Sequence, residues 1–253
     1  MVKSKRNSLI FTIIISLLSV ICIIETIFIG LLLYGKSDES FTEYEWDGGY
    51  NYLAIGNSIT VHEICSYWWT ENGMAATTAE NDYFHRVCNY LESVNGELDS
   101  KAINFVSWEQ EGHDRYQTFS LLRGLINSQL DLITVQLGEN VVDASDFESD
   151  FSDLIYYLLK FAPHAKLIVL GNIMSSKSGV DLDLSKQIVC EKFNVGYINY
   201  KQLNAPEYKC GLGTEVYDSK GDVHIVEHTG VADHPNDEAM KYIANLIINE
   251  LNF

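Results

Sequence analysis

Positive charge is scarce in this sequence. Its 253 residues include 17 lysines and arginines against 35 aspartates and glutamates, a formal net charge of −18 at pH 7. A surface of that sign repels the phosphates of nucleic acids and the headgroups of anionic lipids. We therefore predict no nucleic-acid partner. The charge favours solubility and does not indicate a substrate.

Cysteine and proline are also few. Of the five cysteines, Cys22 lies in an apolar N-terminal segment, and the other four have the spacing of neither a small disulfide scaffold nor a zinc site, so we expect free thiols. The histidines at 224, 228 and 234 fit no standard ligand spacing, and we predict no metal ion and no other cofactor. The sequence has three prolines and no low-complexity tract, so its composition indicates no domain break after the N-terminal segment.

That N-terminal segment is one long apolar run. Residues Leu9 to Leu33 carry a single charge, Glu25, and about 20 such residues cross a bilayer core. A central acidic residue costs about 2.5–3.5 kcal/mol on insertion scales, and each Leu, Ile or Phe returns about 0.3–0.6. The apolar core of a cleavable signal peptide, the alternative, is about 7–15 residues and precedes a small-residue cleavage site, which is missing here. We predict an uncleaved transmembrane anchor within residues 1–35.

The flanking charges give the anchor an orientation. Lysines and arginines precede the run, at positions 3, 5 and 6, and acidic residues follow it, at 38, 39, 43 and 45. The positive-inside rule therefore leaves the N-terminus in the cytoplasm and the remainder outside the cell membrane. With Lys36 and Glu25 also assigned to the anchor, 13 basic and 34 acidic residues remain, a formal charge of −21. We expect a linker over residues 36–48 and a single extracellular domain over residues 49–253.

Short apolar segments alternate with helix-like segments through that domain. The expected strands are Tyr52–Gly56, Ala102–Val106, Leu132–Leu137, Leu167–Gly171 and Gly196–Tyr200. The expected helices are Tyr83–Glu92, Asp114–Ile126, Asp146–Phe161, Asp181–Phe193 and Asn236–Leu251. Repeated strand–helix alternation predicts an α/β fold with a five-stranded parallel sheet and helices on both faces.

Three short segments carry groups that acyl transfer needs. Ser58 follows the first expected strand, Asn140 follows the third, and His234 precedes the last helix. In parallel sheets ligands bind at the carboxyl ends of the strands, where Ser58 and Asn140 would meet. A hydroxyl nucleophile, an amide donor and an imidazole base predict a serine hydrolase.

These segments resemble the SGNH (GDSL) hydrolases. The similarity rests on Gly56-Asn-Ser58-Ile-Thr60, Gly138-Glu-Asn140 and His234-Pro-Asn-Asp-Glu-Ala-Met240, which occur in the family's order between Tyr52 and the C-terminus. The resemblance implies a flavodoxin-like, three-layer α/β/α sandwich that acts on ester bonds, often acetyl groups on sugars. It implies Ser58 as nucleophile and His234 as general base. The Asn140 amide and the Ser58 backbone N–H would form the oxyanion hole.

The sequence departs from the family pattern in two places. An oxyanion glycine usually follows the second strand in a pattern like Asn-x-Gly-x-x-Gly, and alignment with Ser107–Gly112 puts Glu109 at its first glycine. The Glu109 N–H can still complete the oxyanion hole if the carboxylate turns away. The aspartate usually found three residues before the histidine is replaced by Val231, which leaves Asp233 as the candidate third member of the triad. Weaker candidates are Asp222 and Glu227, and a backbone carbonyl that orients the ring would leave a Ser–His pair.

The functional hypothesis is a membrane-anchored extracellular esterase. It would hydrolyse small acyl esters, acetyl esters above all, on a glycan. An O-acyltransferase that uses the same site is one alternative. A non-catalytic glycan-binding module, in which Glu109 has spoiled the oxyanion hole, is another. Three adjacent aromatic residues, Tyr67, Trp68 and Trp69, either line a sugar site or belong to the core.

Overall fold

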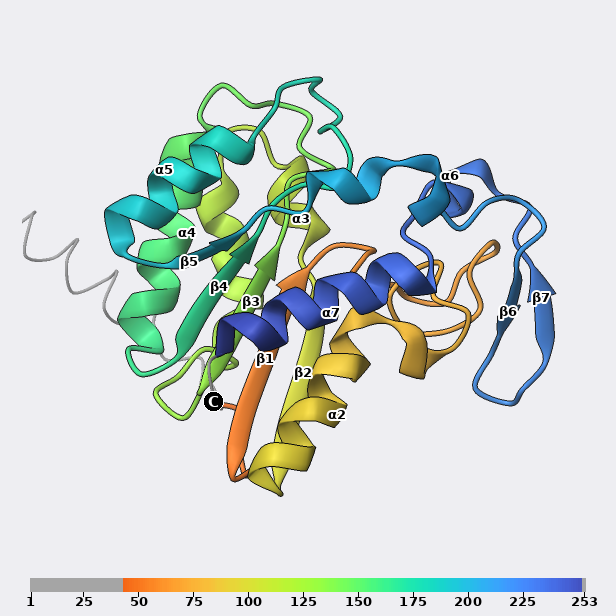
Figure 1. Cartoon of the computed structure of the whole chain (residues 1–253). Coiled ribbons are helices and arrows are strands. Elements are labelled where there is room, and N and C mark those ends of the chain that lie inside the picture. The colour runs from red at the N-terminus through yellow and green to blue at the C-terminus, as the bar shows by residue number, and fades with distance from the viewer. Residues whose placement is uncertain (1–42, 252–253) are drawn as a thin grey trace, which may run out of the picture. The chain divides into compact units, whose positions relative to one another are not determined.

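A computed structural model describes residues 43–251 of the chain, and its centre is a five-stranded parallel sheet (Figure 1). The strands stand in the order β2-β1-β3-β4-β5. They are β1 (Tyr50–Gly56), β2 (Leu98–Asn104), β3 (Leu132–Gln136), β4 (Lys166–Leu170) and β5 (Gly196–Ile198). The predicted α/β fold with a five-stranded parallel sheet is therefore confirmed.

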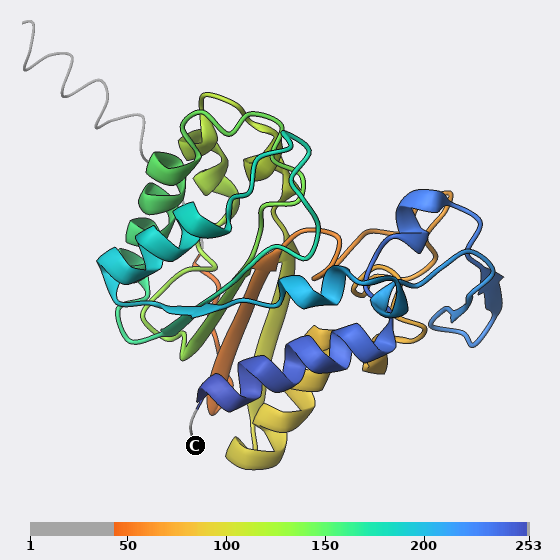
Figure 2. The ribbon, with the colours of Figure 1, turned by 45° about the horizontal axis from the view of Figure 1, so that its top comes forward.

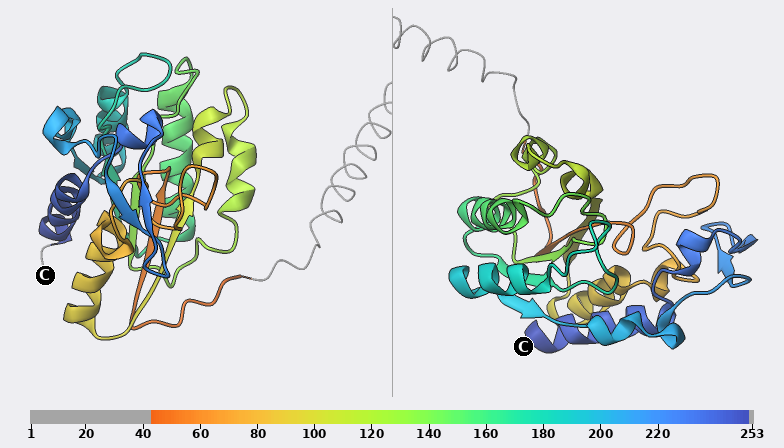
Figure 3. Two further views of the ribbon diagram at one scale, coloured as in Figure 1. Left: turned by 90° about the vertical axis from the view of Figure 1, so that its right-hand side faces the viewer. Right: turned by 90° about the horizontal axis from the view of Figure 1, so that it is seen from above.

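Helices cover both faces of the sheet (Figure 3). One layer holds α2 (Tyr83–Asn95) and α7 (Asp237–Leu251), and the other holds α4 (Phe147–Phe161) and α5 (Asp183–Phe193). Alternate residues of β1 point to opposite faces of the sheet. Tyr52 and Ala54 pack in the core under α2 and α7, whereas Leu53 and Ile55 pack in the core under α4. Burial on both faces explains why the strand sequences are continuously apolar.

A small lobe extends beyond the carboxyl edge of the sheet (Figures 1 and 2). It contains an antiparallel hairpin, β6 (Glu215–Tyr217) and β7 (Val223–Ile225), and the short helix α6 (Thr229–Ala232). Its own core comprises Trp68, Met74, Ala75, Val216, Val226, Val231 and Ala232. Neither the hairpin nor α6, which precedes His234, was predicted from the sequence.

Two element boundaries differ from the sequence predictions. The second strand ends at Asn104, and α3 (Val106–Gln110) begins almost at once. The segment expected as a helix over residues 114–126 contains a 3-10 helix, Arg115–Leu121. The remaining 3-10 helices are Ala79–Asn81, Lys201–Asn204 and Pro206–Tyr208.

The expected linker is partly packed on the domain. Trp46 is buried, and its Nε1 donates a hydrogen bond of 2.9 Å to the Leu125 carbonyl. The packed domain therefore begins before residue 49, because a buried indole with a satisfied N–H belongs to the core. The expected anchor, Leu9–Leu33, lies outside the described residues. Within residues 43–251 no helix combines the length and apolarity that a bilayer crossing requires.

Candidate active site

Ser58 lies in a tight turn directly after β1. A Cβ at Gly56 would lie 1.9 Å from the Thr60 Oγ1, so the turn requires glycine at that position. The backbone N–H of Thr60 donates to the Asn57 carbonyl (2.9 Å), and the N–H of Ile59 donates to the Asn57 side chain (3.1 Å). The turn holds Ser58 at the carboxyl edge of the sheet, on the wall of a cavity of about 480 Å³.

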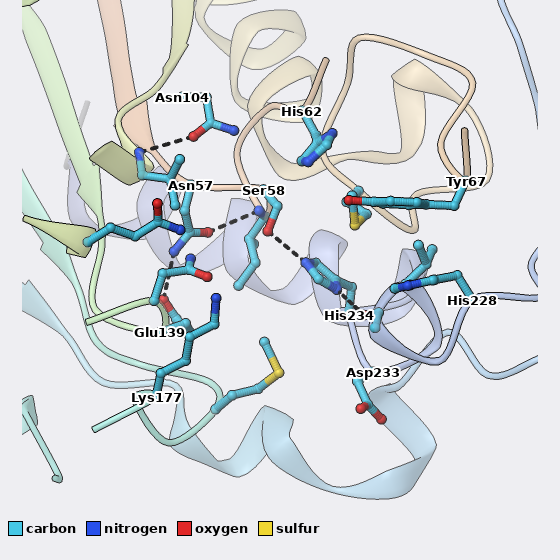
Figure 4. Close-up of a pocket in the computed structure, with 18 of the residues that line it drawn as sticks. Asn57, Ser58, His62, Tyr67, Asn104, Glu139, Lys177, His228, Asp233 and His234 are labelled. Carbon is cyan, nitrogen blue, oxygen red and sulfur yellow. Dashed lines mark hydrogen bonds between the residues drawn. The ribbon is translucent and has the colours of Figure 1, made fainter. Parts of the chain in front are cut away.

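His234 lies next to Ser58 on the wall of the same cavity and contacts it. The distance between the Ser58 Oγ and the His234 Nε2 is 2.7 Å (Figure 4). The other ring nitrogen, Nδ1, lies 2.6 Å from the carbonyl of Gly230 in α6. Because a carbonyl only accepts, Nδ1 carries the proton and Nε2 is left to accept the proton of Ser58. The pair therefore has the geometry of a nucleophile and its general base.

Burial controls the charge of this imidazole. Desolvation lowers the pKa of His234 from its ordinary 6.5 to about 4, although the hydrogen bond to the Gly230 carbonyl opposes the shift. The ring is therefore neutral, and competent as a base, at every pH well above 4.

Asp233 does not orient the imidazole. Its side chain is exposed, and its carboxylate points away from the His234 ring (Figure 4). The partner of Nδ1 is the Gly230 carbonyl. The expectation of Asp233 as third member is therefore corrected in favour of the backbone-carbonyl alternative. The physical reason is that adjacent side chains diverge here, directly after α6.

Asn140 reaches the same cavity from the turn after β3. One N–H of its side-chain amide donates to the Glu109 carboxylate (3.0 Å), which leaves the second N–H for another acceptor. Among residues 43–251 the Ser58 backbone N–H has no acceptor. The structure thus brings Ser58, His234 and Asn140 together, with two N–H groups available to an anionic oxygen.

Glu109 does not reach the cavity wall. Its side chain is fully buried in α3, and Val106 lines the cavity in its place. Because β2 ends at Asn104, the family pattern Asn-x-Gly-x-x-Gly fits Asn104, Val106 and Glu109, three residues earlier than the alignment of the sequence analysis. The N–H of Val106 is bonded to the Asn104 side chain (3.1 Å). The expected oxyanion role of the Glu109 backbone is therefore not supported.

Of the three adjacent aromatic residues, one lines the cavity. Tyr67 stacks on His228 with ring centroids 4.4 Å apart and planes at 15°, and both rings belong to the cavity wall (Figure 4). Trp68 is fully buried in the core of the lobe, and Trp69 stacks on His224 instead. The sequence named Tyr67 as one of three candidates for a sugar site and did not indicate His228 as its partner, because their contact joins two loops distant in the chain.

No protein-family model matches this sequence, and no curated protein matches it. Solved structures do. A two-domain esterase active on acetylated mannans, crystallised with mannopentaose, superposes with a TM-score of 0.50 at 12% identity, covering 80% of this chain and 49% of that one. A family-two carbohydrate esterase from Clostridium thermocellum in complex with cellohexaose gives a TM-score of 0.49 at 17% identity, covering 80% of this chain and 63% of that one. This chain spans about half the length of the two-domain esterase. At 12% identity the likeness to the two-domain esterase establishes a shared fold alone.

Proposed function

We propose that this protein is a serine esterase that removes small acyl groups, acetyl above all, from a glycan. The observation that carries the proposal is the 2.7 Å contact between the Ser58 Oγ and a His234 Nε2 whose partner nitrogen is bound to a carbonyl. A serine so placed next to a neutral imidazole is an activated nucleophile.

Acylation begins when the Ser58 Oγ attacks the ester carbonyl carbon while its proton moves to the His234 Nε2. The Gly230 carbonyl then holds the other proton of the imidazolium. The carbonyl oxygen becomes an oxyanion, and the Ser58 N–H and the second N–H of the Asn140 amide are the donors within the cavity that suit it. Collapse of the tetrahedral intermediate expels the alcohol, which takes the proton from Nε2.

Deacylation repeats these steps with water. The His234 Nε2 accepts a proton from water, the hydroxide attacks the acyl-Ser58 carbonyl, and the acid leaves as Ser58 recovers its proton. Glu109 leaves this cycle undisturbed, because its carboxylate is buried and occupied by other N–H donors. That placement favours an enzyme over a glycan-binding module with a spoiled oxyanion hole.

The glycan is supported by the cavity and by the neighbours in fold. The stacked Tyr67–His228 pair offers an aromatic face on the cavity wall, the kind of surface on which a sugar ring packs. The fold is shared with an esterase active on acetylated mannans. The location proposed is the outer face of the cell membrane, supported by the apolar run Leu9–Leu33 and its flanking charges.

The test uses the full chain in detergent micelles. We expect hydrolysis of p-nitrophenyl acetate and release of acetate from acetylated manno-oligosaccharides, and labelling of Ser58 by a fluorophosphonate. Ser58→Ala should abolish the labelling and lower kcat by at least about 10³-fold. Retention of activity in Ser58→Ala would refute the proposal. Acetyl transfer to an added sugar in preference to water would instead identify the acyltransferase.

A further inference from the structure

Two carboxylates are buried directly behind the catalytic turn. Glu109 in α3 is fully buried, and Glu139, next to Asn140, is 5% exposed. The side-chain amide of Asn57, the neighbour of Ser58, lies between them and donates to Glu109 (3.2 Å) and to Glu139 (3.0 Å). Burying such groups is costly unless they are hydrogen-bonded, so their partners indicate what they hold in place.

The partners of Glu109 concentrate on the turn that carries Asn140. Its Oε1 accepts the backbone N–H of Gly138 (2.5 Å) and that of Asn140 (3.1 Å), and its Oε2 accepts the Asn140 side-chain amide (3.0 Å). With the bond from Asn57, four N–H groups donate to one carboxylate. This set suits the ionised form, which only accepts and offers about four lone-pair sites.

The bond to the side-chain amide decides which way Asn140 faces. An amide has a nitrogen end that donates and an oxygen end that accepts, and only the nitrogen end can bond to the Glu109 Oε2. The same nitrogen supplies the N–H offered to the oxyanion. If the amide turned over, an oxygen lone pair would face the developing negative charge.

We propose that Glu109 is a positioning residue of the oxyanion hole: its carboxylate clamps the Gly138–Asn140 turn and keeps the Asn140 amide nitrogen toward the reacting ester. The inference rests on the proposed function. It reverses the expectation that an acidic residue in this motif spoils the site.

Glu109→Gln tests the clamp with almost no change in shape. If the glutamine oxygen keeps the two backbone N–H groups, its amide nitrogen faces the Asn140 nitrogen, donor against donor. Asn140 must then turn over. We expect kcat to fall by about 10- to 10³-fold, the range up to loss of a whole oxyanion donor, with KM within about threefold. Asp150→Asn is the matched control, because it removes a carboxylate bound to the buried Arg115, away from the cavity, and should leave kcat unchanged.

A double-mutant cycle separates positioning from general destabilisation. If Glu109 acts through Asn140, Glu109→Gln should cost less than about threefold in kcat on an Asn140→Ala background. The inference is overturned if the double variant loses kcat by the product of the two single losses. It is also overturned if Glu109→Gln alone leaves kcat within about threefold of the native value. Should Glu109→Gln not fold, Glu109→Asp keeps the charge but withdraws the carboxyl by one methylene, and the same cycle applies.

Ser58→Ala, assayed beside these variants, distinguishes the two levels of failure. If Ser58→Ala retains activity, the proposed function fails. If Ser58→Ala is inactive and Glu109→Gln is not, only the clamp fails. Complete labelling of Ser58 by a fluorophosphonate after long exposure should persist in Glu109→Gln, because the Ser58–His234 contact does not involve Glu109.

Discussion

Acid is the perturbation to which this site should respond in an unusual way. A His234 with an ordinary pKa of 6.5 would be about 9% neutral at pH 5.5, whereas the half-buried ring, with its pKa lowered to about 4 by desolvation, is about 97% neutral there. Because only the neutral ring can accept the proton of Ser58, kcat/KM at pH 5.5 should stay close to its plateau. The acid limb of the profile should have its midpoint near 4.

The assay is acetate release from an acetylated oligosaccharide at fixed times between pH 3.5 and 8, followed by re-assay at pH 7.5 to exclude acid denaturation. This control matters because a histidine with a lowered folded-state pKa destabilises the fold as pH falls from 6.5 to 4, where the unfolded chain binds the extra proton. Titration of Glu109 would also produce an acid limb, at a higher pH than that of His234, because burial and the Glu139 charge raise the pKa of its carboxyl. Histidine NMR titration, assigned with His234→Gln, separates the two. A His234 resonance that titrates near 6.5 would refute the reasoning.

Three further outcomes follow from the geometry. Asp233→Asn should change kcat/KM by less than about threefold, because the carboxylate does not orient the ring, and a loss near 10⁴-fold would reinstate it as a triad member. Tyr67→Ala should raise KM for acetylated oligosaccharides several-fold and leave that for p-nitrophenyl acetate unchanged, and equal effects on both substrates would contradict a sugar-binding role. Trp46→Ala should lower the free energy of unfolding by about 3–5 kcal/mol in urea titrations, and a change below about 1 kcal/mol would return this residue to the linker.

The sequence specified the sheet and the meeting of Ser58 with Asn140, because both follow from periodicity and from where parallel strands end, whereas the place of His234 beside them was implied only by the family resemblance. Ser58 and Asn140 had to share the carboxyl edge of the sheet once β1 and β3 were recognised. The partner of His234 was not predictable, since the Gly230 carbonyl carries no side-chain signature. The alignment that placed Glu109 at the first glycine of the family pattern has one cause. Phe105 and Val106 are apolar and were predicted as the end of a strand, whereas β2 ends at Asn104 and α3 begins at Val106.

The low basicity of His234 and the orientation of the Asn140 amide are linked through the energetics of acyl transfer. Burial lowers the pKa of His234 to about 4 and makes protonation of the ring roughly 3 kcal/mol less favourable than at 6.5, so proton transfer from Ser58 is harder than to an ordinary imidazole. One well-placed oxyanion donor contributes about 2.7–4 kcal/mol, which is the same size. A site whose base is weakened by burial must therefore obtain much of its rate from the oxyanion hole. The orientation of Asn140 then decides the rate, and Glu109 fixes that orientation. The Glu109 carboxylate is buried at a cost in desolvation and is bonded to both the backbone and the side chain of Asn140.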